Sequence, residues 1–213
     1  MPLNDVGIVT TSRGPRGLSA GAATTLWIDP SGAQVVMDFL TKAILDGHGF
    51  QIRLGALTTP VAGDIEVTTT AAEMSADSVA GHVLLPVHFT FDLEALGGTL
   101  PQASVKMTAT ASTAGTAFTP LPLLTGGRAA ATTARAAAAG GVTVVDDAVT
   151  TTRLLYASHQ TAMGNLEVDV DLWGTGAVNG AGNIYVAVGS VTTGSNYFSR
   201  LDYLEYTTGQ LGL

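Results

Sequence analysis

The stretch His82-Val-Leu-Leu-Pro-Val-His-Phe-Thr-Phe-Asp-Leu-Glu94 decides the fold class. Apolar side chains recur at every second position, which is the period of a β-strand with one buried face. The buried face is expected to hold Val83, Leu85, Val87, Phe89, Phe91 and Leu93. The opposite face is expected to hold His82, Leu84, Pro86, His88, Thr90, Asp92 and Glu94. Pro86 has no N–H to donate to a sheet, so this strand should lie at a sheet edge or carry a β-bulge there.

The same two-residue period continues on both sides of this strand. It recurs over residues 51–57, 64–70, 104–111, 142–145, 151–159, 166–173, 183–191 and 201–206. Gly-rich turns at 174–176 and 179–182 separate the later strands, and Asn179-Gly180 is a strong turn signal. About eight or nine short strands at this spacing predict an all-β fold, an antiparallel β-sandwich of the jelly-roll type, over residues 50–213.

The first part of the chain is expected to differ from the sandwich. Residues 1–25 predict a flexible arm, because Gly14, Pro15 and Gly17 break any periodicity and the segment has little apolar surface to order it. Two interpretations remain open, a frayed tail and an arm that orders against a neighbouring subunit. Residues 26–49 predict a short strand or anchor, Leu26-Trp27-Ile28, followed by one short helix.

The helix is predicted over residues 31–46. Asp29 would be its N-cap and Pro30 its first residue, a common start signal, and Gly47 would stop it. The alternative is a hairpin that turns on residues 29–32.

A second irregular segment is predicted at residues 125–141. Paired glycines bracket an Ala-rich core that contains Arg128 and Arg135. Alanine has the highest helix propensity, but this core is near the length at which an isolated helix is marginal. The segment therefore predicts a long Gly/Ala-rich surface loop, or a short helix, that joins two halves of the sheet.

The composition excludes several classes of protein. Of the 213 residues 46% are hydrophobic and only 12% are charged, so the chain is neither disordered nor rich in the long apolar runs of membrane helices. It has no Cys, which excludes disulfides, thiolate nucleophiles and Cys-bound zinc. With nine Lys and Arg and a formal net charge of −8, direct nucleic-acid binding is not expected. No signal peptide is expected at the N-terminus.

Glu167, Asp169 and Asp171 form the most distinctive polar pattern. The two-residue period places the three carboxylates on one face of one strand, with neighbours about 7 Å apart. Three interpretations remain open: a solvated outer face, a surface for a partner's Arg or Lys, and a Ca²⁺ site completed by carbonyls of the turn at 174–176.

Catalytic residues are not evident. The four histidines are too separated to suggest a metal site, and no nucleophile elbow, phosphate loop or dinucleotide motif occurs. Six aromatic residues cluster late in the chain, where they are expected to be core and corner residues rather than a sugar cleft: Trp173, Tyr185, Tyr197, Phe198, Tyr203 and Tyr206. The sequence therefore predicts no enzyme and no cofactor.

Three parts of the chain carry a resemblance to a known class of proteins. They are the arm Gly7–Gly17, the Thr-rich strand Asp64–Thr70 and the closing run Ser199–Gly209. In these features the chain resembles bacteriophage virion structural proteins of the jelly-roll capsid, spike or head-decoration type. The resemblance implies a trimer or larger symmetric assembly with copies of itself and other virion proteins, made in the host cytoplasm. With only Arg13 and Arg16 in the arm, it implies an outer position away from nucleic acid.

Low charge also favours a surface that packs against other subunits, since charged residues are depleted at buried interface cores. Residues expected at such interfaces are Arg13, Arg16, Trp27, Arg128 and Arg135. The alternative function is a carbohydrate-binding or adhesin-like module, with or without assistance from Ca²⁺, suggested by the late aromatic residues and the three carboxylates.

Overall fold

The structure is a computed structural model, and its elements are almost all β-strands. It describes residues 7–9, 23–25, 38–56, 58–64, 70–95, 101–138, 140–145, 151–159, 167–190 and 196–213. The two helices are α1 (Phe39–Leu45) and α2 (Thr208–Leu211). The eight principal strands are β3 (Gly49–Leu54), β6 (Met74–Asp77), β7 (His82–Ala95), β8 (Pro101–Thr108), β14 (Thr152–His159), β15 (Glu167–Asp171), β17 (Asn183–Ser190) and β18 (Asn196–Thr207).

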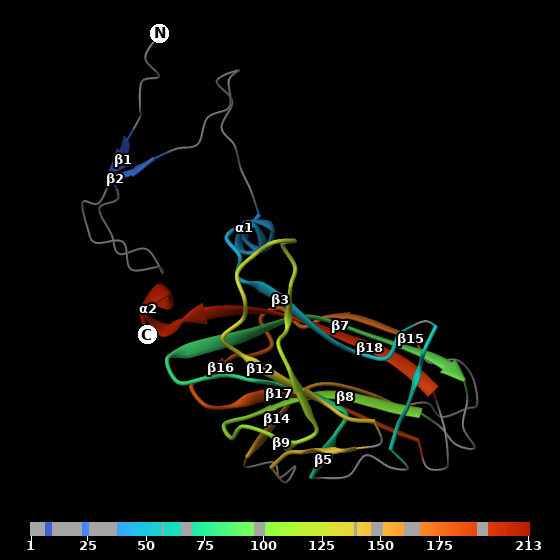
Figure 1. Cartoon of the computed structure of the whole chain (residues 1–213). Coiled ribbons are helices and arrows are strands. Elements are labelled where there is room, and N and C mark those ends of the chain that lie inside the picture. The colour runs from blue at the N-terminus through green and yellow to red at the C-terminus, as the bar shows by residue number, and fades with distance from the viewer. Residues whose placement is uncertain are drawn as a thin grey trace.

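These eight strands form two facing antiparallel sheets (Figure 1). One sheet has the order β3-β18-β7-β15 and the other β6-β17-β8-β14. The first principal strand therefore pairs with the last, the second with the seventh, the third with the sixth and the fourth with the fifth. This is a long antiparallel hairpin rolled around one core, so the predicted jelly-roll sandwich is confirmed.

Shorter strands extend this framework. They are β4 (Val61–Ala62), β5 (Ala71–Ala72), β9 (Thr113–Ala114), β10 (Thr116–Phe118), β11 (Leu121–Pro122), β12 (Thr133–Ala136), β13 (Val142–Thr143) and β16 (Val178–Asn179). Within the predicted arm, β1 (Gly7–Val9) pairs with β2 (Ala23–Thr25) in antiparallel register. Arg13, Arg16, the anchor at 26–28 and most of the predicted strand 64–70 lie outside the described residues.

Strand β7 confirms the predicted bulge and corrects its predicted faces. The pairing with β18 skips Val87, since Asp202 lies opposite His88 and Tyr203 opposite Pro86. Phe89, Phe91 and Leu93 lie in the core between the sheets, as predicted. On the N-terminal side of the bulge, the residues predicted to be buried point away from this core. Leu84 packs in the core, whereas Leu85 and Val87 belong to a second cluster under α1. A bulge adds one residue to one strand, and so reverses the alternation beyond it.

The alternative position of β7, at a sheet edge, is wrong. β18 lies on one side of β7, and β15 and β16 lie on the other. β15 pairs with residues 88–92 of β7 and β16 with residues 83–84, so Pro86 falls in the gap between these two partners. The missing N–H of Pro86 therefore costs no sheet hydrogen bond on that side.

Helix α1 is shorter than predicted and begins at a different aspartate. Asp38 is the N-cap, and its carboxylate accepts a hydrogen bond from the Thr41 N–H at 2.9 Å. Because Asp38 has an extended backbone, the predicted continuous helix from residue 31, capped by Asp29, is wrong. The predicted stop at Gly47 is confirmed by its left-handed φ of 79°. The helix packs onto Leu204 and Tyr206 of β18.

The predicted surface loop at 125–141 contains a strand. β12 pairs with β6, where Thr133 lies opposite Asp77, and also with β10. Just before this strand, β11 pairs with β3, where Leu121 lies opposite Gln51. The interpretation as loop or helix is therefore wrong at residues 133–136, because the unpaired backbone of β6 takes up this segment despite its high alanine content.

Candidate functional site

The outermost strand of one sheet carries the predicted row of carboxylates. β15 pairs with β7 on one side and, among the described residues, with no strand on the other. Val168 is buried, whereas Glu167, Asp169 and Asp171 are exposed on the outer face. Asp92 of β7 is also exposed and lies opposite Glu167. We call these four side chains, Asp92, Glu167, Asp169 and Asp171, the acidic edge.

One histidine is part of this surface. The imidazole Nε2 of His88 lies 2.5 Å from Oδ1 of Asp169, with 72% of the Asp169 side chain exposed. A pair this exposed is screened by water and contributes little to stability. It does fix the position of one carboxylate of the acidic edge.

The neighbouring strands carry the positive charges of the same face. Arg53 of β3, Arg200 of β18, Thr90 of β7 and Asp169 of β15 lie in one row across the sheet. The Arg200 guanidinium donates to Asp202, and this hydrogen bond raises the pKa of Arg200. With Asp202, the described side chains of this face include five carboxylates and two guanidiniums, so they are acidic overall.

The predicted Ca²⁺ ligands do not converge. Among the residues that the structure describes, no group of three or more His, Cys, Asp or Glu side chains could hold a metal ion. Side chains two apart on a strand are about 7 Å from each other, too far for one ion to bridge all three.

Two predicted interface residues, Arg128 and Arg135, make contacts within the chain. Arg128 donates to the buried carboxylate of Glu205 at 2.8 Å and lies over the Phe50 ring at 4.9 Å. Arg135 donates to the carboxylate of Asp77 at 3.2 Å. About 40% of the Arg128 side chain and 29% of the Arg135 side chain remain exposed. Both arginines fasten the segment between β8 and β14 to the sandwich.

Sequence reasoning missed the buried carboxylates that receive these arginines. Glu205 accepts hydrogen bonds from the Thr132 hydroxyl, from the backbone N–H groups of Ala131 and Thr132, and from Arg128. Burial raises the pKa of Glu205, but these hydrogen bonds outweigh burial and lower the pKa below its usual value. Glu205 lies in a strand of alternating apolar and polar residues, and nothing in the neighbouring sequence indicates that its carboxylate is buried. Only the two arginines in an otherwise apolar segment hint that a counter-charge is needed.

Glu73 is a third buried carboxyl, between β5 and β6. Its oxygens accept hydrogen bonds from the backbone N–H of Val188 at 2.6 Å and of Asp64 at 3.3 Å. Burial raises the pKa of Glu73 to about 8, and the nearby Asp64 adds to this. These contacts tie three segments of the chain together.

Four of the six late aromatic residues are core residues, as predicted, and Phe198 is half-buried. Tyr185, Tyr197 and Tyr203 are fully buried, and Tyr206 is nearly so. Trp173 is 48% exposed, and its ring packs against Phe39 of α1 at 5.3 Å between centroids. These rings therefore do not form an open platform for a sugar.

Comparison of the chain with protein families, with curated proteins and with solved structures finds no match. Neither α1 nor α2 is long and apolar enough to cross a membrane, and these are the two helices of the described residues.

Proposed function

We propose that this chain is a structural virion protein, a capsid, cement or vertex component of a bacteriophage type, that acts by self-association. One observation carries the proposal: one edge of the jelly roll is covered by the chain's own segment, whereas among the described residues the opposite edge is unpaired and acidic. Jelly rolls also occur in lectins and cupins, so the fold alone would not select this function.

The partner that fits the acidic edge is the N-terminal arm of another copy. The arm contains Arg13 and Arg16 and no acidic residue between them. No strand of the described residues pairs with the outer side of β15, and an extended segment can pair with such an edge.

The strength of such a contact depends on repetition. One exposed ion pair contributes about 0.2–1 kcal/mol, too little to hold two subunits together. In a closed ring each subunit gives one arm and receives one, so that the weak contacts act together. An acidic outer face would also repel nucleic acid, which supports a position on the outside of a particle.

The test is the solution mass of the full chain, measured by light scattering on a sizing column. We expect a trimer or larger closed assembly that dissociates when residues 1–25 are deleted, with the β-sheet circular dichroism signal unchanged. The double variant Asp169→Asn, Asp171→Asn should weaken assembly by about tenfold in concentration and remove part of its salt dependence.

The matched control is Asp46→Asn, which neutralises an exposed carboxylate that pairs with Lys42 on α1. This variant should assemble as the unmodified chain does. A monomer at every concentration would contradict the proposal. So would an assembly whose number of subunits is unchanged when residues 1–25 are deleted.

A further inference from the structure

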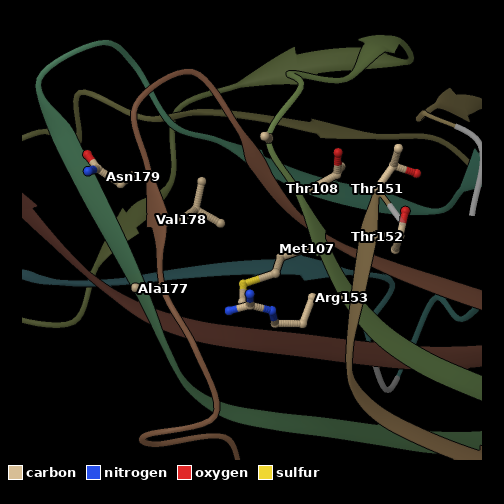
Figure 2. Close-up of a pocket in the computed structure, with 9 residues that line it drawn as sticks. Met107, Thr108, Thr151, Thr152, Arg153, Ala177, Val178 and Asn179 are labelled. Atoms are coloured by element: carbon tan, nitrogen blue, oxygen red, sulfur yellow. The ribbon is translucent and has the colours of Figure 1, made fainter. Parts of the chain in front are cut away.

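A small pocket opens at the same side of the sandwich as the acidic edge. It lies where the end of β8 and the start of β14, from one sheet, face β16 from the other sheet (Figure 2). Its volume is about 280 Å³. The two sheets do not pair with each other here, so the pocket is the gap between their outermost strands.

Close packing of Gly182 against the backbone holds the walls of this pocket in place. A Cβ atom on Gly182 would lie 2.4 Å from the Thr108 carbonyl oxygen. The hairpin that carries β16 therefore approaches β8 more closely than any larger residue would allow. On its other side β16 is held by pairing of Val178 with Leu84 of β7.

The lining of the pocket contains one charged side chain, Arg153. Arg153 lies opposite Met107 in the pairing of β14 with β8, and Figure 2 shows its side chain extending toward Met107. Among the described residues no carboxylate lies within ion-pair distance of it. In a chain with 17 acidic and nine basic residues, a guanidinium in a pocket without a carboxylate is a local exception.

The rest of the lining is of two kinds. Hydroxyl and amide groups come from Thr108, Thr151, Thr152 and Asn179. Apolar surface comes from Met107 and Val178, and small methyl side chains complete the wall. A guanidinium beside hydroxyl groups and an apolar floor suits a ligand with one carboxylate, several hydroxyls and a C–H face.

We propose that this pocket binds a sugar acid, a single hydroxylated ring that carries a carboxylate. Its volume lies just below the range of pockets for drug-sized ligands, which fits one ring rather than a nucleotide or an oligosaccharide. The carboxylate pairs with Arg153, and the ring hydroxyls meet the threonines and Asn179. This inference does not rest on the virion function, and it places sugar recognition away from the buried tyrosines.

The test is titration calorimetry of the full chain with glucuronate, glucose and inorganic phosphate as separate probes. We expect glucuronate to bind with a Kd of about 1–10 mM and glucose at least about tenfold more weakly. Arg153→Gln should abolish glucuronate binding. Arg153 is exposed, so this variant should unfold at the same temperature as the unmodified chain.

Two further variants separate charge from shape. Ala177→Leu should block the pocket without changing any charge, and so should also abolish glucuronate binding. Arg53→Gln is the matched control, because it removes an exposed arginine on a different strand, and should leave binding unchanged. The proposal is overturned by no heat with glucuronate, by equal affinity for glucose, by equal affinity for phosphate, or by normal binding in Arg153→Gln. The solution mass of Arg153→Gln should equal that of the unmodified chain. The loss of glucuronate binding could then not be attributed to a loss of self-association.

Discussion

The two edges of the sandwich differ in whether their carboxylates are buried or exposed. At the closed edge, β11 extends the sheet beyond β3 and β12 extends the other sheet beyond β6. Carboxylates there are buried and receive hydrogen bonds from arginines and backbone N–H groups. At the open edge, β14 and β15 are outermost among the described strands, and the carboxylates of β15 are exposed.

This contrast is the physical basis of the self-association that we propose. An unpaired strand edge invites association, and proteins usually cover it or charge it. The closed edge is covered by the chain itself and fastened by charges that are fully satisfied. At the open edge the described residues offer exposed negative charge and no covering strand, which would keep identical edges apart and suits the basic partner that we propose.

The largest effect is expected from breaking the closed edge at Glu205. Glu205→Ala would leave Arg128 and the N–H groups of Ala131 and Thr132 without their acceptor. Removing one partner of a buried charge network costs about 3–5 kcal/mol. Urea unfolding of the two proteins measures this free energy, and a loss below about 1 kcal/mol would mean that the closed edge is not held by this carboxylate.

A second effect of the buried carboxyls should appear as a pH dependence. The pKa of Glu73 in the folded chain is about 8, against an ordinary value of 4.5. Between these two values the folded chain binds more protons than the unfolded chain, so the stabilisation is complete below pH 4.5 and is lost as the pH rises through 8.

Urea unfolding at pH 5, 6.5 and 8 checks this expectation. The free energy of unfolding should fall with rising pH by at most about 1.4 kcal/mol per unit more steeply than in Glu73→Gln. The variant keeps an oxygen for one backbone N–H and cannot ionise. Parallel pH profiles for the two proteins would show that Glu73 does not ionise on unfolding in this range.

The sequence predicts the alternation of strands well and the exceptions to it poorly. The pattern from Phe89 to Leu93 identifies core residues correctly, because burial on one face imposes a period of two. The same pattern misplaces Leu84, since one bulged residue reverses the faces. The prediction allowed a bulge at Pro86, but the sequence does not say on which side of the bulge the sandwich core lies.

Local sequence signals for secondary structure also fail where contacts with distant parts of the chain determine the structure. Asp29-Pro30 and Asp38 are both good helix starts, and the apolar patch of Leu204 and Tyr206 favours a helix that begins at Phe39. The alanines of residues 129–138 favour a helix, but pairing with β6 outweighs that preference. At the candidate site the carboxylates of β15 follow from their spacing. The pocket at Arg153 does not, because strands far apart in the sequence build it.

The smallest effect is expected at the open edge, where Asp169→Asn removes the negative charge from the contact with His88. The Asp169 carboxylate is 72% exposed, so we expect a loss of less than about 1 kcal/mol in the free energy of unfolding. The closed-edge variant Glu205→Ala, measured in the same way, gives the scale for this comparison. If Asp169→Asn costs as much as Glu205→Ala, the open edge is a structural element of the monomer. If it leaves the monomer stable and weakens only the assembly, the carboxylate serves a contact between subunits.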